Sequence, residues 1–430
     1  MPWRRYALHL TVLFATLLCV QAPRFSRLAA EAGAPVFAPN RGYLDFDHGY
    51  YPAGKAIRTN PSTLYRGAVY DRHEGTLRLT APARFVNLPL VAWLFVPLAE
   101  LPLPWAETLW LLFNIGVALT CLLLLQERIA ASGAVWRWAV TLAFVTSGPL
   151  MNALNLGQTT PLILLFLLLG ERCLSRGRDG RAGLWLGLAC LIKVPPLLFL
   201  PYFALRRRWL VLATAGAVLV ATVGLSVVWY GWPLHGTYFD VNIRANAGAA
   251  LAAHNCQSID AFLARVSTDR PLWSWQTIAL GGGSRTVKWL LLAGLAAACG
   301  WALKGGPRVG YPRMLVELAM VLCAGLVALP VSWVHYGMWL LPVAVLVGGA
   351  RMSLRLPQRH WWVALVVVGG FLINLPVPPP AVIRRLGDQM WFRVAISHQL
   401  FGTVLFLGMG IAALRWSCDR REPQGGGLQP

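Results

Sequence analysis

Long runs of hydrophobic residues, separated by short polar segments, dominate the chain. A helix needs about 20 consecutive apolar residues to cross the hydrocarbon core of a membrane. Runs near this length predict spans at 6–23, 106–126, 136–153, 160–175, 209–230, 287–303, 314–331, 336–350, 361–377 and 397–416. The pattern therefore predicts an all-α polytopic membrane protein.

One further apolar stretch, 183–205, is interrupted by Lys193-Val194-Pro195-Pro196. Proline removes a helical hydrogen bond and clashes with the preceding turn, so we expect two shorter helices that meet at a break. With these two, the chain is expected to cross the membrane about twelve times. We treat residues 1–416 as one transmembrane domain and 417–430 as a tail.

The charged residues are strongly biased toward Lys and Arg, which number 38 against 17 Asp and Glu, a formal net charge of +21. In a soluble protein this excess would suggest nucleic-acid binding. Here the charged residues make up 13% of the chain, where soluble domains have about a quarter, and the basic ones lie in short segments between apolar runs. We therefore expect no nucleic-acid partner.

Basic clusters mark the cytoplasmic side of membrane proteins. The clusters are Arg137, 172–181, 206–208, 304–313, 351–359 and 415–421. If all of them face the cytoplasm, both termini do so too, and the first helix is an uncleaved span with its start inside. The expected location is the inner (plasma) membrane of a bacterium.

The same alternation leaves four polar segments outside: 24–105, 231–286, 332–336 and 378–395. The first contains an apolar piece, Phe85–Leu101, that is interrupted by Pro89 and Pro97. Counting this piece as a crossing would invert every later loop. We therefore expect it to form helix against the outer membrane interface.

Two carboxylates, Asp45 and Asp47, follow the first span. A carboxylate at the edge of a low-dielectric layer is costly unless it is solvated, paired or functional. It can act as a general base, and a solvated loop carboxylate is the alternative. The Asp-x-Asp pattern also suits metal-diphosphate binding, but alternating acids are common by chance, so we expect no metal and no other cofactor.

Three cationic or imidazole groups suit a phosphate. Lys193, within apolar sequence, needs an anionic partner or a water-filled cavity, and snorkelling to the interface is the alternative. A lysine binds phosphate as a point charge. His335 lies in a short outer turn, and Arg265 lies in the segment 231–286.

Other outer residues suit sugar hydroxyls. Trp333 and Tyr336 can stack on a sugar, although an interfacial aromatic belt would also explain them. The remaining candidates for sugar or acceptor binding are Tyr50, Tyr51, Gln158, Asn255, Gln257 and Ser258. Each is an ordinary loop residue when taken alone. The chain has no Walker loop, Rossmann glycine pattern or zinc-ligand cluster, so nucleotide binding is unsupported.

Several short motifs, in their order and spacing, resemble those of glycosyltransferase family 87, the polyprenol-phosphate-mannose-dependent mannosyltransferases. They are Asp45 to Gly54, Leu109 to Asn114, Gly157-Gln158, Gly187 to Pro196, Arg206 to Trp209, Asn255 to Ser258, and Ser332 to His335. The resemblance spans nearly the whole chain. It implies a GT-C membrane fold, an active site at the outer face, and inverting transfer of a hexose from a polyprenyl-phosphate donor.

The resemblance also implies that the base is the Asp after the first span. This sequence carries one residue more than expected between Asp-Phe and Tyr-Tyr, so Asp45 and Asp47 both remain candidates, with Asp45 favoured. Lys193 and His335, with Arg265, would stabilise the leaving phosphate. Tyr336 stands where the family often has a second His, so the sugar or acceptor preference can differ.

Two other function classes compete with a transferase. A flippase or transporter of lipid-linked sugars also fits a broken helix with a buried cation. A non-catalytic assembly subunit would leave the carboxylates without a role. We favour the transferase mainly because of the family resemblance, and also because the candidate chemical groups gather on one outer side. Its acceptor is expected to be a lipid or a glycan.

Overall fold

The computed structural model describes residues 6–31, 45–65, 68–71, 76–79, 85–130, 133–305, 309–343 and 359–418. The longer helices are α1 (Ala7–Glu31), α4 (Leu103–Arg128), α5 (Ala134–Val145), α6 (Gly148–Leu156), α7 (Thr160–Leu174), α8 (Asp179–Ile192), α10 (Trp209–Tyr230), α13 (Gly282–Ala302), α14 (Tyr311–Ala328), α16 (Arg359–Asn374) and α19 (His398–Cys418). A short antiparallel hairpin, β1 (Ala68–Asp71) with β2 (Thr76–Leu79), interrupts the helices.

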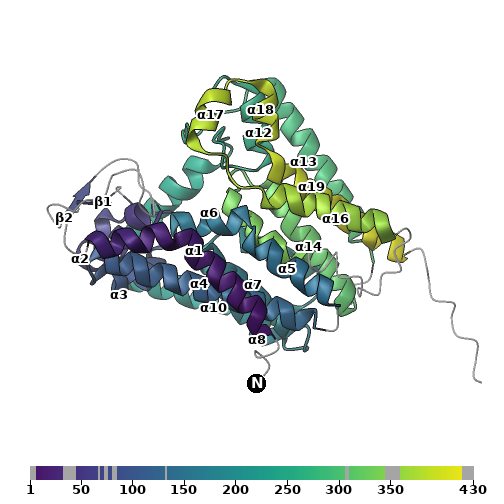
Figure 1. Ribbon diagram of the computed structural model, residues 1–430, viewed down its shortest axis with the longest axis horizontal. Coiled ribbons are helices and arrows are strands. Elements are labelled where there is room, and N and C mark those ends of the chain that lie inside the picture. The colour runs from purple at the N-terminus through teal and green to yellow at the C-terminus, as the bar shows by residue number, and fades with distance from the viewer. Residues whose placement is uncertain are drawn as a thin grey trace, which may run out of the picture.

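The shorter helices lie in the segments that were predicted to be outside. They are α2 (Tyr51–Thr59), α3 (Val96–Ala99), α11 (Trp232–Tyr238), α12 (Ile259–Ser267), α17 (Pro380–Leu386) and α18 (Met390–Ala395). Figure 1 shows α2 and the hairpin at one corner of a wedge, and α12, α17 and α18 at another. The long helices run from these two corners toward the remaining end of the molecule (Figure 1).

The all-α membrane architecture is confirmed, whereas the count of about twelve crossings is not. Five helices in the described ranges are long and apolar enough to cross a membrane: 103–128, 134–156, 209–230, 311–328 and 398–415. Several predicted spans form shorter apolar helices. The span predicted at 136–153 is divided between α5 and α6, because Ser147 caps α6 by accepting from the Leu150 amide at 3.2 Å, with Pro149 in its first turn.

Two other boundaries differ from the prediction. The first helix continues to Glu31, beyond the expected end at residue 23. The span predicted at 336–350 begins as a 3₁₀ helix, η8 (Val334–Leu340), and residues 344–350 lie outside the described part. The tail also lies outside it from residue 419 on, so the division at 416 and 417 stays a prediction.

The break at the proline pair is confirmed. Helix α8 ends at Ile192, and Lys193 has extended backbone angles, φ −145° and ψ 146°. A 3₁₀ turn, η5 (Pro195–Leu198), then leads into α9 (Phe199–Leu205). Because the backbone leaves the helix at Lys193, its side chain takes a direction that a continuous helix would not allow.

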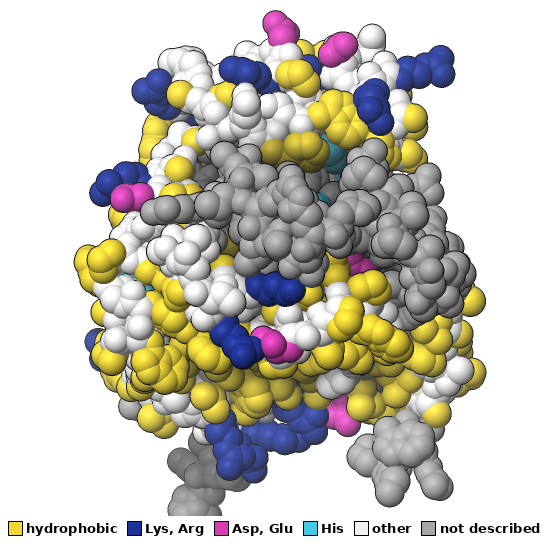
Figure 2. Space-filling model, turned by 90° about the vertical axis from the view of Figure 1, so that its left-hand side faces the viewer, with side chains coloured by type: hydrophobic (Ala, Val, Ile, Leu, Met, Phe, Trp, Pro, Cys, Tyr) yellow, Lys and Arg dark blue, Asp and Glu magenta, His cyan; other side chains and the backbone are white. Residues whose placement is uncertain are grey.

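The apolar piece at 85–101 forms a 3₁₀ helix, η4 (Pro89–Phe95), that continues into α3. It packs closely on α2, since a Cβ on Gly54 would lie 2.7 Å from the Phe95 carbonyl oxygen. Trp93 and Leu94 on the same piece are exposed. Hydrophobic side chains also gather over the lower half of the face in Figure 2, with Lys and Arg at its upper and lower margins. An apolar band between charged margins is typical of a membrane-embedded protein.

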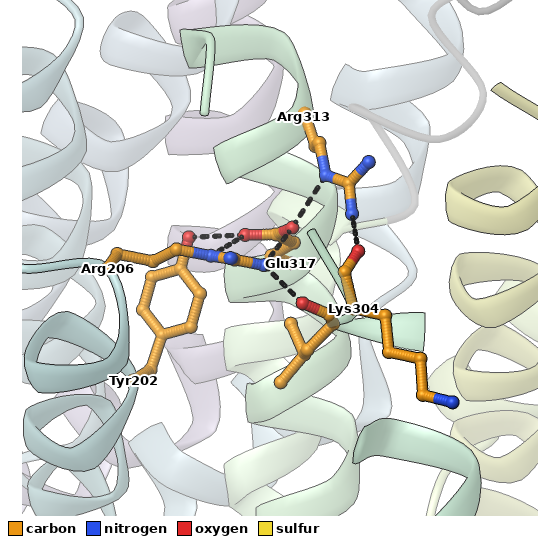
Figure 3. A network of polar contacts seen from close by, with 6 residues as sticks. Tyr202, Arg206, Lys304, Arg313 and Glu317 are labelled. Carbon is orange, nitrogen blue, oxygen red and sulfur yellow. Dashed lines mark hydrogen bonds and ion pairs between the residues drawn. The ribbon is translucent and has the colours of Figure 1, made fainter. Parts of the chain in front are cut away.

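The segments predicted to be cytoplasmic converge at one end of the bundle. The Arg206 side chain reaches Glu317 of α14 and the Leu303 carbonyl oxygen, and Arg313 reaches the Lys304 carbonyl oxygen (Figure 3). At the same level Arg128 donates to the Tyr311 hydroxyl at 2.7 Å. The segments around 206, 304 and 313, which the charge pattern assigned to one side, therefore lie together; residues 351–358 and 419–421 of the same pattern are outside the described part of the chain.

Helices α8 and α10 approach each other through glycine. A Cβ on Gly183 would lie 2.4 Å from the Val211 carbonyl oxygen, and one on Gly187 would lie 2.9 Å from the Val218 Cβ atom. Small residues four apart allow this close packing of membrane helices. We expect Gly183→Ala to lower the free energy of unfolding by about 1–3 kcal/mol through overpacking. Thermal denaturation in detergent measures it, with Gly216→Ala on α10 as the control, because a Cβ there meets nothing within 4 Å. Equal melting temperatures for the two variants would contradict this packing.

Candidate active site

The acidic segment begins with a π-helical turn. Asp45 precedes this turn, η2 (Phe46–Tyr50), which continues directly into α2. The wider i→i+5 hydrogen-bond pattern takes up one more residue in the turn than an α-helix does. Such π turns are rare in proteins overall, and those that occur are often at functional sites. The additional residue inferred from the family resemblance falls in the same segment, and its insertion stays a prediction. Asp47 is 3% exposed inside the turn, whereas Asp45 is only half-buried.

Aromatic packing holds the turn in place. The Phe46 ring stacks on Trp110 of α4 with centroids 5.9 Å apart, and Tyr50 stacks on Phe95 at 4.6 Å. All these rings are buried. The turn therefore has a fixed position against α4 and η4, and this fixes the direction in which Asp45 leaves the backbone.

A second turn brings Gln158 toward Asp45. Helix α6 ends at Gly157, whose φ of +68° lies in the left-handed region that glycine adopts without strain. The Gln158 amide donates back to the Ala153 carbonyl oxygen at 2.9 Å, and the Trp110 indole donates to the Gly157 carbonyl oxygen at 2.7 Å. Trp110 thus ties both turns together.

The Gln158 side chain connects the Asp45 carboxylate to the Lys193 ammonium. Its Nε2 donates to the Asp45 Oδ2 at 2.5 Å, and its Oε1 accepts from the Lys193 Nζ at 2.8 Å. The Tyr50 hydroxyl donates to the same Oε1 at 3.0 Å. An ammonium only donates and an ionised carboxylate only accepts, so this orientation of the amide is the one that satisfies both. We call this group the Asp45–Gln158–Lys193 chain.

Tyr50 has two neighbours that the sequence did not single out. Asn87 and Thr159 both approach its hydroxyl, and burial raises the pKa of Tyr50 above its ordinary value. The hydroxyl is therefore protonated and acts as a donor. The sequence offered two signals for these residues: Asn87 is a side-chain amide within the apolar piece 85–101, and Thr159 directly follows Gln158.

On its other side, Lys193 meets two predicted site residues. Its Nζ lies 5.1 Å from the centroid of the Tyr336 ring, a cation–π distance, and the His335 ring packs edge-on against Tyr336 at 4.9 Å. His335 is 3% exposed, and burial, with the Lys193 charge as a second cause, lowers its pKa well below the ordinary value. Its imidazole is therefore neutral. Within the described residues no hydrogen-bond partner reaches its Nε2.

The loop after residue 250 pairs with the His335 turn through its backbone. The Val334 amide donates to the Asn255 carbonyl oxygen at 2.9 Å, and the Gln257 amide donates to the Ser332 carbonyl oxygen. Trp333 stacks parallel to His335 at 6.5 Å. The side-chain amide of Asn255 accepts from Trp275 at 3.2 Å, next to this group. Two of the predicted outer segments, 231–286 and 332–336, are therefore adjacent in space.

Four predicted site residues make other contacts. The Tyr51 hydroxyl donates to the Leu101 carbonyl oxygen at 2.8 Å, and Ser258 caps α12 through the Ala261 amide at 3.1 Å. Gln257 donates to the Ile396 carbonyl oxygen at 2.9 Å. Arg265, fully buried, donates to the carbonyl oxygens of Ala253 and Cys256 and to Ser397. These contacts hold the outer loops together. The binding roles expected of these four residues stay predictions, and this geometry does not support them.

An apolar groove lies between α7, α8, α9, α14 and η8. Its lining includes Leu168, Leu186, Phe199, Leu322 and Trp339. The Trp339 ring stacks on Tyr336 at 4.5 Å, and the Tyr336 ring lies under Lys193, so two aromatic rings separate the groove from the ammonium.

No group of three or more His, Cys, Asp or Glu side chains is placed to hold a metal ion in the part of the chain that the structure describes.

Comparisons with known proteins agree on one family. The model of glycosyltransferase family 87 matches residues 85–332, which include Gln158 and Lys193. A polyprenol-phosphate-mannose-dependent alpha-(1-2)-phosphatidylinositol mannoside mannosyltransferase of Mycolicibacterium smegmatis is 28% identical over 87% of this chain and 85% of that protein. The Mycobacterium tuberculosis enzyme of the same name is 29% identical over 81% of this chain and 80% of its own length.

Among solved structures, ArnT from Cupriavidus metallidurans in its apo state aligns with 92% of this chain and 77% of its own, at 18% identity and a TM-score of 0.32. The family match covers more than half of the chain, and the chain belongs to glycosyltransferase family 87, as a membrane-embedded enzyme.

Proposed function

We propose that the protein transfers a hexose, mannose, from a polyprenyl-phosphate donor to a lipid or glycan acceptor at the extracytoplasmic face of a bacterial plasma membrane, with inversion. The Asp45–Gln158–Lys193 chain carries this proposal, because it places a carboxylate and an ammonium at opposite ends of one buried amide. A carboxylate suits the acceptor hydroxyl, and an ammonium suits the donor phosphate. Both termini then face the cytoplasm, together with the basic clusters.

The reaction needs one base and one site for negative charge. The Asp45 carboxylate takes the proton of the acceptor hydroxyl as its oxygen attacks the anomeric carbon. The bond from that carbon to the phosphate oxygen breaks on the opposite face, and its electrons leave with the polyprenyl phosphate, which inverts the configuration. A phosphate leaves well without a general acid. Lys193 holds the phosphate charge, and the Nε2 of His335, which no hydrogen-bond partner reaches among the described residues, donates a hydrogen bond to it.

The position of Asp45 favours it over Asp47 as the base. Asp45 is half-buried and contacts Gln158, whereas Asp47 is 3% exposed within the π turn. A base must reach the acceptor hydroxyl, and a carboxylate at the rim of the site does so with less rearrangement. Tyr50, Asn255, Trp333 and Tyr336 surround the same place and are proposed to orient the sugar or the acceptor.

The apolar groove supports a lipid-linked donor. It lies between the helices, with Trp339 connecting its wall to the Tyr336 ring, and is lined almost throughout by aliphatic and aromatic side chains. An isoprenoid chain gains free energy by leaving water for such a surface. A nucleotide diphosphate would find no matching charge along it.

The test is transfer in proteoliposomes that contain the purified protein, radiolabelled polyprenyl-phosphate mannose and a mannosylated phosphatidylinositol as the first acceptor. We expect a new glycolipid with the label, and none when a nucleotide sugar replaces the donor. A flippase would move the labelled lipid between leaflets without forming a glycosidic bond. Movement without a labelled product, across a panel of lipid and glycan acceptors, would reject the transferase.

Removal of the ammonium should weaken both donor binding and transfer. We expect Lys193→Met to lower kcat/KM for the donor by about 10²- to 10³-fold, because the phosphate charge then develops in a buried site without its cation. Lys304→Met is the matched control, since Lys304 is exposed and belongs to the network around Glu317 (Figure 3), which does not include Lys193. Equal activity of the two variants would mean that Lys193 does not contact the phosphate.

A further inference from the structure

Gln158 has little capacity left to bind a substrate. Its carbonyl oxygen accepts from both Lys193 and Tyr50, which uses the two acceptor positions of an amide oxygen. One N–H of its amide nitrogen points at Asp45, which leaves one. The side chain is 7% exposed. A side chain that binds a sugar would need free donors and acceptors, and Gln158 has only one N–H left to offer.

The place of the amide between two charges has a physical consequence. A cation at the amide oxygen draws electron density from the nitrogen, and this strengthens the hydrogen bond that the nitrogen donates. The charge of Lys193 therefore reaches Asp45 through Gln158. Gln158 also keeps the Asp45 carboxylate and the Lys193 ammonium from direct contact. In a direct ion pair, Asp45 would be a weaker base for the acceptor hydroxyl, and Lys193 would be less available to the donor phosphate.

We propose that Gln158 is a positioning residue of the transfer reaction: its amide holds the Asp45 carboxylate ionised and oriented, and keeps the Lys193 ammonium available to the donor phosphate. This inference rests on the proposed function. It gives Gln158 a different role from the sugar or acceptor binding that the sequence suggested. The Gly157 turn and the Trp110 indole, which set the direction of the side chain, belong to the same device.

The experiment compares the pH dependence of kcat/KM in the wild type, Gln158→Met and Gln158→Glu. Methionine keeps the length of the side chain but neither donates nor accepts strongly. The ionised carboxylate then loses a hydrogen bond that favours it, so we expect kcat to fall by about 10- to 100-fold and the acidic limb to move up by about one pH unit. Glutamate keeps the shape and adds a like charge, so the acidic limb should also move to higher pH.

Gln126→Met is the matched control. Gln126 is equally buried and donates to the Arg137 carbonyl oxygen and to Thr141, away from Lys193 and Asp45. This variant should lose thermal stability without moving the acidic limb. If Gln158→Met is instead poorly folded, the limb position of its folded fraction decides the question, because a purely structural role would leave that limb in place.

The outcomes separate this inference from the proposed function. An inactive Asp45→Asn together with an unmoved acidic limb in both Gln158 variants would overturn the inference alone. A higher KM for the acceptor with an unmoved limb would make Gln158 an acceptor ligand and overturn it too. Full activity of Asp45→Asn would remove the base, and with it the proposed mechanism.

Discussion

Asp45→Asn should reduce the rate of sugar transfer by about 10²- to 10⁴-fold, the usual contribution of a general base. Asparagine keeps the shape of the side chain, and its oxygen can still accept from Gln158, so the fold and the chain of contacts are retained. What it loses is the ability to take the proton of the attacking hydroxyl. Initial rates at saturating donor, with the folded fraction measured in parallel, give the result.

Two other aspartates provide the comparison. Asp47→Asn lies in the buried part of the π turn, and we expect it to act through stability, with a normal rate for each folded molecule. Asp240→Asn changes an exposed residue whose ion pair with Arg244 is at the surface, and it should leave the rate unchanged. A rate loss confined to Asp47→Asn would transfer the role of base to that residue.

Glu317→Ala should lower the free energy of unfolding by about 3–5 kcal/mol, the cost of leaving a buried charge without its partner. Glu317 is fully buried and accepts from Arg206 through two nitrogens, at 2.8 and 2.6 Å. Tyr202 at 2.9 Å and Arg313 at 2.9 Å donate to the same carboxylate (Figure 3). Alanine leaves the Arg206 guanidinium, 2% exposed, uncompensated. Thermal or denaturant unfolding in detergent measures the loss.

A double substitution separates the cost of losing the Arg206–Glu317 ion pair from the cost of leaving one of its charges buried and alone. Arg206→Met with Glu317→Met removes both charges and fills the space, so it should recover most of the stability. Glu100→Ala breaks an exposed pair with Arg58 and should cost no more than about 1 kcal/mol. If Glu317→Ala were as mild as Glu100→Ala, the network in Figure 3 would not anchor this end of the bundle.

Several features were predictable because their causes are local in the sequence. Apolar runs fix which segments prefer a membrane, and Pro195-Pro196 ends α8 three residues earlier, at Ile192, by a steric effect on the preceding turn. The distribution of Arg predicted that the loops near 206 and 304 lie on one side of the membrane, and in the structure these loops are in contact. Arg128 and Tyr311 are joined in the same way. The family resemblance of the short motifs is confirmed by the match over residues 85–332.

Other features were beyond reach because they depend on packing. The apolar run that contains η8 gives no sign that its first part is a 3₁₀ helix. The sequence after residue 23 likewise gives no sign that α1 continues to Glu31. Arg265 is predicted to bind phosphate because a guanidinium in an outer loop suits an anion, and that role stays a prediction. Nothing in the sequence indicated that the same guanidinium donates to the carbonyl oxygens of its own loop, where an isolated backbone group would be costly.

The amino-acid sequence alone determined that this is an all-α membrane protein of family 87, with two carboxylates after the first helix and a lysine at a broken one. Hydrophobicity, proline sterics and motif order act over a few residues or along the chain, so they can be followed without coordinates. Only the tertiary structure decided that one amide joins Asp45 to Lys193, across 113 and 35 positions of sequence. Contacts at such separations arise from how helices pack, and packing depends on the complementary shapes of many side chains at once.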